Sequence, residues 1–278
     1  MPLTKNPNHN YSIERRWYGD INRRWREATR ALVAINVPRL ILNFSYTEEQ
    51  QIEFYLQQIR TIIEDLVLPP EWQNQYQREA YERALKTSDA GILGTFPTEE
   101  AAALLFALTT EIDFSQLHRQ EVAFLSKRAN DALINQMNSF LAALPTLIRD
   151  NITLSVVEIK RLIRNKFNSY KSSARRIATT ETAQAAQRAA LLRSQEIQDA
   201  TGLKTDVRWV TANDSKVRHL HAGWHGRIFD REQALRNMQI SPWNCRCALR
   251  PVVETRIPAR QNAKFNKERK ILLASQKN

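Results

Sequence analysis

The sequence is poor in glycine, which interrupts helices, and in cysteine, which crosslinks chains. Only 6 of its 278 residues are glycine and only 2 are cysteine. Few glycines favour helices, because glycine is poorly compatible with a helix interior. Two cysteines are too few to stabilise a fold of this size by disulfide bonds, and they indicate a reducing compartment.

Long apolar runs are lacking as well. The longest, AAALLFAL at residues 101–108, fits a core helix and is far shorter than the roughly 18 residues that a membrane span needs. The first ten residues are polar and contain two prolines, so they show no apolar signal stretch. We therefore expect no membrane partner, while hydrophobic residues, at 42%, suffice for a core.

Charge of one sign dominates the C-terminal half. The chain has a net charge of +12, and residues 151–278 carry 25 Lys and Arg against 10 Asp and Glu, whereas residues 51–150 carry 8 against 14. A strongly basic segment suits a polyanion, of which nucleic acid is the most obvious. A solvated basic face, or a site for an acidic protein partner, would show the same composition.

Apolar residues recur at helical spacing through the first 200 residues. One stripe starts at Ile13 and contains Trp17 and Trp25, which we expect to bind a protein partner, because tryptophan is favoured at interface hot spots. Further helices are predicted between the capping box TEEQ at 47–50 and Pro69, and over residues 71–86, 98–110, 115–145, 151–167 and 172–200.

The pattern changes after Gly202. TDVRWVTA (205–212) is rich in β-branched and aromatic residues and predicts a strand. GRIF (226–229) and CRCALRPVV (245–253) predict two more strands. Pro251 favours an edge position for the last of them, because proline donates no ladder hydrogen bond.

The predicted fold class is mainly α, with a helical N-terminal part followed by a small α+β C-terminal module that has a short antiparallel sheet and a basic tail. Within the module, Asp230 resembles the cap of a short helix. We expect an N-terminal arm with a basic amphipathic helix, a helical domain, a module that joins a long helix to the sheet, and a basic tail, at residues 1–45, 46–150, 151–253 and 254–278.

Both cysteines and three of the histidines lie close to the last predicted strand. Four of these residues have the types and number of ligands for a tetrahedral zinc site: His221, His225, Cys245 and Cys247. The Cys-x-Cys spacing differs from the wider gap that is typical of structural zinc sites. The favoured interpretation is therefore that the cysteines are small buried packing residues and that the protein has no cofactor.

The same region offers an alternative function. Asp214, Arg218 and His221 supply an acid, a phosphate clamp and a base, as in a metal-dependent nuclease or another nucleic-acid-modifying domain. Nothing in their spacing fixes a geometry for such chemistry. The chain has no P-loop, no G-x-G-x-x-G and no G-x-S-x-G motif, which disfavours nucleotide-driven motors and common hydrolases.

Three blocks, in order, resemble the phage Mu F-like family of minor head proteins, also called head morphogenesis proteins. They are RRIATTETAQAAQRAA, VRWVTANDSKVRHLHAGWHGRIF and PWNCRCALRPVV, the last of which is similar to the family's Pro-x-x-Asn-Cys-Arg-Cys ending. The family usually has an acidic residue just before the glycine, where this chain has His225. The matching positions are Thr180, Glu181, Trp209, Asp214, Arg218, His221, Gly226, Asn244, Cys245, Arg246 and Cys247.

The resemblance implies a virion structural protein and not an enzyme. Such a protein assembles in the host cytoplasm and lies inside the phage head. It binds the portal protein and other head proteins, contacts the packaged double-stranded DNA and can influence genome ejection. The matching residues would be structural, and we expect Arg218 and Arg246 to bridge the strands to the long helix through Glu181.

The basic tail at 254–278 is expected to be mobile and to contact DNA. Its charge is accompanied by no recognition motif, so we expect binding to duplex DNA without sequence preference. The cations available for this contact are Arg256, Arg260, Lys264, Lys267, Arg269 and Lys270.

Overall fold

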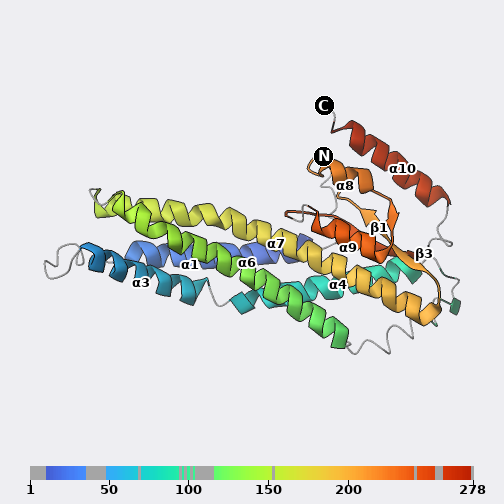
Figure 1. The fold of residues 1–278 in the computed structure, drawn as a ribbon, viewed down its shortest axis with the longest axis horizontal. Coiled ribbons are helices and arrows are strands. Elements are labelled where there is room, and N and C mark those ends of the chain that lie inside the picture. The colour runs from blue at the N-terminus through green and yellow to red at the C-terminus, as the bar shows by residue number, and fades with distance from the viewer. Residues whose placement is uncertain are drawn as a thin grey trace. The chain divides into compact units, whose positions relative to one another are not determined.

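The chain is mainly helical with one small sheet near its C-terminus, as the sequence predicts (Figure 1). This computed structural model describes residues 11–35, 48–67, 70–93, 96, 99–100, 103, 116–151, 154–240, 243–253 and 259–276. Most of the helix predicted at 98–110 lies outside the described residues. The elements are α1 (Tyr11–Ala34), α3 (Glu48–Leu66), the 3-10 helix η1 (Pro70–Gln73), α4 (Asn74–Leu93), α6 (Gln116–Arg149), α7 (Val156–Thr201), β1 (Thr205–Val210), α8 (His219–Trp224), β2 (Ile228–Phe229), α9 (Arg231–Gln239), β3 (Ala248–Val253) and α10 (Ala259–Ala274).

Two helices are longer than the sequence predicts. α6 continues through Pro145 to Arg149, although a proline removes one backbone donor from a helix interior. α7 is a single helix of 46 residues, which replaces the separate helices predicted at 151–167 and 172–200. Residues 168–171 are Asn-Ser-Tyr-Lys, and none of these residue types stops a helix.

The chain forms two compact units, each assembled from separate segments. The sequence predicts segment boundaries after residues 45, 150 and 253. Each unit contains parts of several of the segments that these boundaries define. The sheet unit consists of Met1–Glu14, Gln75–Ser126 and Thr179–Asn278, and the helical unit consists of Arg15–Asn74 and Lys127–Ala178.

Two tryptophans of the helical unit are buried. Trp17 and Trp25 are 0% and 1% exposed. The ring of Trp25 stacks on Phe167, with centroids 5.3 Å apart and an interplanar angle of 13°, and its Nε1 donates to the Phe167 carbonyl oxygen at 3.3 Å. The prediction that these tryptophans bind a partner is wrong, because both side chains are buried within the chain.

The sheet of the other unit has the strand order β2-β1-β3, with both pairs antiparallel. Val207 of β1 lies opposite Phe229 on one side and opposite Pro251 on the other. β3 is an edge strand of this sheet, which confirms the position predicted from its proline. The short helix α9 follows the predicted cap, in which Asp230 accepts the backbone N–H of Gln233 at 2.7 Å.

The C-terminal segment differs from the mobile basic tail that the sequence predicts. Residues 259–274 form the helix α10, which lies next to α8 (Figure 1). Leu272 of this helix is buried in a cluster with Val217 and Ala222. Leu272 and Leu273 of KILLA thus pack α10 against the rest of the sheet unit, which explains why the segment is not a loose tail.

Gly226 allows the close approach of α10. Its φ of +76° is in the left-handed region, and a Cβ atom there would lie 2.4 Å from the Cβ atom of Phe265. Any other residue would be strained and would displace the helix. On its other side Phe265 meets the buried Arg208, whose guanidinium lies 4.6 Å from the ring centroid and donates to Asn262 Oδ1 at 2.7 Å.

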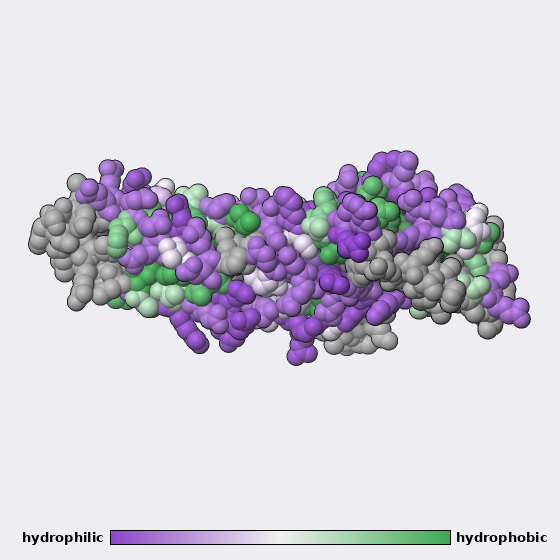
Figure 2. Space-filling model, turned by 90° about the horizontal axis from the view of Figure 1, so that it is seen from below, coloured by the Kyte–Doolittle hydropathy of each residue, from purple (hydrophilic) through white to green (hydrophobic). Residues whose placement is uncertain are grey.

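Hydrophilic side chains cover most of the face shown in Figure 2, and hydrophobic residues lie there in separate small groups. This surface agrees with the mean hydropathy of −0.51 for the chain. Within the described residues, we find no helix that combines the length and the apolar character needed to cross a membrane.

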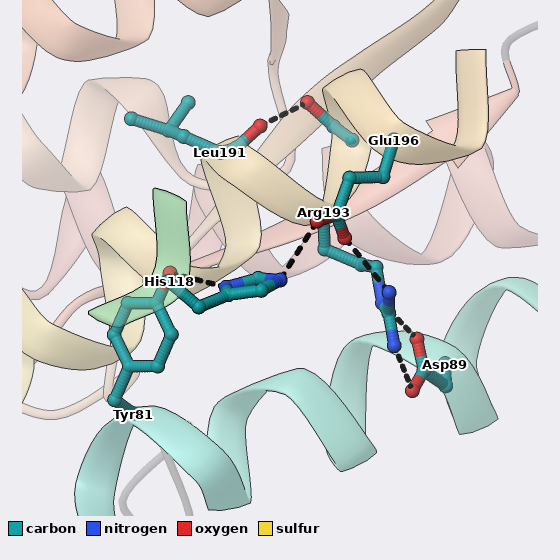
Figure 3. Close-up of polar contacts among 7 residues, drawn as sticks. Tyr81, Asp89, His118, Leu191, Arg193 and Glu196 are labelled. Carbon is teal, nitrogen blue, oxygen red and sulfur yellow. Dashed lines mark hydrogen bonds and ion pairs between the residues drawn. The ribbon is translucent and has the colours of Figure 1, made fainter. Parts of the chain in front are cut away.

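A buried polar network joins α4, α6 and α7 within the sheet unit (Figure 3). Arg193 of α7, 2% exposed, donates to both carboxylate oxygens of Asp89 at 2.6 and 2.9 Å and to Glu196 at 2.7 Å. Glu196 also lies 2.7 Å from His118 Nε2, and His118 Nδ1 lies 2.8 Å from the Tyr81 hydroxyl. The network therefore fixes three helices through charged groups that are removed from water.

The network keeps Glu196 in its charged form. Burial raises the pKa of this carboxyl group, but the hydrogen bond and charge of His118, together with Arg193, outweigh it, so that the pKa lies below its usual value. Burial and the negative charges of Glu121 and Glu196 raise the pKa of Tyr81. The phenol therefore stays protonated and available as a hydrogen-bond donor.

Glu196→Gln should lower the free energy of unfolding at neutral pH by about 2 kcal/mol, the order of a hydrogen bond to a charged group. Because the folded-state pKa is depressed, the contribution of the carboxylate is complete above the unfolded pKa of about 4.3. It is lost as the pH falls through the folded-state value. Urea denaturation should therefore show the difference between wild type and variant shrinking below about pH 4.

The matched control is Glu232→Gln, which removes a largely exposed carboxylate that pairs with Arg236 at 3.4 Å. This change should cost less than about 0.5 kcal/mol. If both variants behave alike, or if the effect of Glu196→Gln does not change with pH, the network does not stabilise the unit as described.

Candidate functional site

Most of the motif residues converge on one part of the sheet unit, which we call the motif corner. They come from α7, β1, the turn after β1, α8 and the segment before β3. The backbone N–H of Gly226 donates to the carbonyl oxygen of Trp209 at 2.7 Å, and Gly226 itself lies where α10 approaches. The members of the motif corner are Thr180, Trp209, Asp214, Arg218, His221, Asn244, Cys245, Arg246 and Cys247.

Two side chains of α7 hold the segment before β3. Asn244 has a φ of +55°, in the left-handed region that asparagine tolerates better than most residues. Its backbone N–H donates to Thr180 Oγ1 at 2.7 Å, and Gln187 Nε2 donates to the Cys247 carbonyl oxygen at 2.7 Å. Gln187 is not among the site residues predicted from the sequence. It lies seven residues after Thr180, and this spacing places both side chains on one face of a helix.

An ion pair closes the turn after β1. Both terminal nitrogens of Arg246 donate to Asp214, at 2.7 Å each, and this hydrogen bonding raises the pKa of the guanidinium. Arg218 donates to the carbonyl oxygen of Trp243. Arg218 and Arg246 were expected to bridge the strands to α7 through Glu181, and the contacts described above are different ones. Glu181 is 3% exposed on α7, and a pairing through it stays a prediction.

His221 is held between two tryptophans. Its ring stacks on Trp224, with centroids 5.1 Å apart and an interplanar angle of 19°, and meets the edge of Trp209 at 5.6 Å. Nε2 lies 3.2 Å from the carbonyl oxygen of Ile240. The ring therefore has a fixed orientation, with Nδ1 directed away from that carbonyl.

Both cysteines lie at the Nδ1 atom of His221. Its distance to the Sγ atom is 3.6 Å for Cys245 and 3.5 Å for Cys247, and both are buried free thiols. The hydrogen bond with Cys247 and the nearby imidazole lower the pKa of Cys245. The same hydrogen bond, followed by burial, raises the pKa of Cys247.

His225, the fourth candidate zinc ligand, lies outside this cluster, so that part of the ligand set is wrong. Its Nδ1 is 2.9 Å from Thr211 Oγ1 and its Nε2 is 3.2 Å from Glu268 Oε2. Burial lowers the pKa of its imidazole. His225 thus joins Thr211, the residue after β1, to α10. Three candidate ligands remain together: His221, Cys245 and Cys247, whose donor atoms lie within 4.8 Å of one another.

The geometry does not favour the nuclease alternative. The pocket at the motif corner has room for a single water molecule. Asp214 is engaged by Arg246 and by the backbone N–H of Lys216 at 3.0 Å, and His221 by the thiols and a carbonyl. Neither side chain is presented as an acid or base to a space that admits a nucleotide.

The cations that were expected to bind DNA differ in how exposed their side chains are. Arg269 is partly buried and donates to the carbonyl oxygen of His225 at 3.1 Å. Arg256 lies outside the described residues. The others are exposed on α10: Arg260, Lys264, Lys267 and Lys270.

Residues 154–250 match a family model described as phage Mu protein F like protein. The matched segment contains every member of the motif corner, which confirms the resemblance indicated by the three sequence blocks. The comparison with curated proteins and the comparison with solved structures gave no match.

Asp214→Asn should lower the free energy of unfolding by about 2 kcal/mol, because it weakens a two-point, charge-assisted contact to Arg246. Asp199→Asn removes the same charge at an exposed position of α7 and should change stability by less than about 0.5 kcal/mol. Urea denaturation of both variants measures the difference. Equal stabilities would show that the ion pair does not hold the corner.

Proposed function

The chain carries a phage Mu protein F like domain, and from this we propose that it is a minor structural protein of a phage head. The family match over residues 154–250 carries the proposal. In this function the protein assembles with the portal or other head proteins in the host cytoplasm. It then stays inside the virion, where it contacts the packaged DNA until ejection.

A structural function agrees with the contacts of the motif corner. Thr180, Asp214 and Arg246 are used in hydrogen bonds that join α7 and the turn after β1 to the segment before β3. Trp209 is fully buried, with its ring against Trp224. These residues stabilise a module, as expected for a protein that works by binding.

The charge of α10 supports the contact with DNA. The helix carries five Lys and Arg residues and one Glu. This residue, Glu268, lies 3.2 Å from His225 Nε2 and pairs at 3.9 Å with the exposed Lys264. Arg260, Lys264 and Lys267 are exposed, and their spacing of four and then three residues places them on one face. Because Phe265 and Leu272 anchor the helix, these cations form a fixed surface for phosphate groups.

A triple variant tests this surface: Arg260→Gln, Lys264→Gln and Lys267→Gln. Affinity for two unrelated duplexes is measured by fluorescence anisotropy between about 50 and 200 mM salt. Each lost phosphate contact reduces the slope of log affinity against log salt by about 0.9, so the variant should lose about 3 from the wild-type slope. The two duplexes should bind wild type equally, because non-specific binding reads only the backbone.

A second triple variant provides the control, with the same change of charge at exposed positions in the acidic part of the chain: Arg60→Gln, Lys86→Gln and Lys127→Gln. Its salt slope should equal that of wild type. Substitutions are preferred to deletion of residues 254–278, since a deletion also removes the packing of Phe265 and Leu272. A strong preference for one duplex, or binding that ignores salt, would contradict non-specific DNA contact.

Membership of the head has its own test. When the protein is produced with the other head proteins of its phage, it should sediment with heads that contain no DNA. It should remain there after nuclease treatment, and mass spectrometry should detect it in mature particles. Recovery in the soluble fraction alone would refute a head protein, whereas loss of DNA binding alone would leave the head assignment in place.

A further inference from the structure

Three donor atoms converge on one point of the motif corner. His221 Nδ1 lies 3.6 and 3.5 Å from the Sγ atoms of Cys245 and Cys247, and all three atoms lie within 4.8 Å of one another. A tetrahedral zinc ion with Zn–S and Zn–N bonds of about 2.3 and 2.0 Å separates its nitrogen ligand from each sulfur ligand by about 3.5 Å. The observed N–S distances correspond to the edges of such a tetrahedron.

The orientation of His221 suits a metal ligand. The Ile240 carbonyl oxygen, 3.2 Å from Nε2, can only accept a hydrogen bond, so the proton of the neutral ring lies on Nε2. The lone pair of Nδ1 then faces the two thiols. Metal-bound histidines almost always donate their second ring N–H in this way, which fixes the tautomer and the angle of the ring.

The Cys-x-Cys spacing also fits the local backbone. Cys245 and Cys247 lie in the non-helical segment that leads into β3, and in an extended chain residues i and i+2 point to the same side. The backbone N–H of Cys247 lies 3.5 Å from Cys245 Sγ, as a donor to a thiolate would. A wider gap between cysteines is therefore not needed for both sulfur atoms to reach one ion.

The types of the three donor atoms select among metal ions. A bound cation uses all three donor atoms, and two thiolates with one imidazole select zinc over harder ions such as magnesium or calcium.

We propose that His221, Cys245 and Cys247 bind one zinc ion, with a water molecule in the adjoining pocket as the fourth ligand. The pocket has room for a single water, so the ion is structural and not catalytic. It joins α8 to the segment before β3 and so stabilises the corner that Thr180 and Asp214 hold from other sides.

Elemental analysis of the full-length chain, purified under reducing conditions, should find one zinc per chain. Removal of the ion with a chelator should lower the melting temperature by at least about 5 °C, and added zinc should restore it, because an ion bound only by the folded state stabilises that state. Replacement by cobalt(II) should give the intense visible absorption of a tetrahedral site and a thiolate-to-cobalt band in the near ultraviolet.

Ligand variants locate the ion. Cys245→Ser, Cys247→Ser and His221→Gln should each lose the stoichiometric zinc, whereas His225→Gln should keep it, because that histidine is buried nearby but faces Thr211 and Glu268. Because a ligand variant can fail to fold, the cobalt spectrum of wild type decides independently. The proposal is overturned if wild type binds no stoichiometric zinc and its melting temperature ignores zinc and chelator, or if the three ligand variants keep their zinc.

Discussion

The half of α7 that belongs to the sheet unit buries polar side chains, and each of them needs a hydrogen-bond partner. Without partners, the buried polar groups would destabilise the fold by more than the packing of the neighbouring alanines stabilises it. Thr180 and Gln187 therefore bind the segment before β3, and Arg193 binds Asp89 of α4. This requirement fixes where the sheet, the motif corner and α4 lie along one long helix.

The same constraint separates two kinds of positive charge. Arg193 and Arg246 are paired with carboxylates inside the sheet unit, so their charge stabilises the fold and is not available to a polyanion. The exposed cations of α10 lie on a helix that Phe265 anchors against Arg208, and Gly226 gives it the space to approach. The basic character of the C-terminal half thus combines a structural part with an accessible part, and only the second can contact DNA.

Features that depend on neighbouring residues could be predicted from the sequence. The helices follow the spacing of apolar residues, the cap at Asp230 follows its side chain, and Pro251 lies in an edge strand because it has no N–H to donate. Predictions about exposure were less successful. Trp17 and Trp25 lie on the apolar stripe of α1, whose side chains are buried. Periodicity shows that a stripe exists, but the partner that covers it is defined only in three dimensions.

By itself the sequence determined the mainly helical fold class, the small antiparallel sheet and the residues that match the Mu F-like family, because these depend on local pattern and residue type. Only the tertiary structure decided which histidine joins the cysteines. His221 and His225 are chemically alike and four residues apart, but α8 ends at Trp224. His225 consequently turns toward Glu268, a residue 43 positions away, while His221 faces Cys245 and Cys247. Contacts between such distant residues arise from packing, which no local pattern encodes.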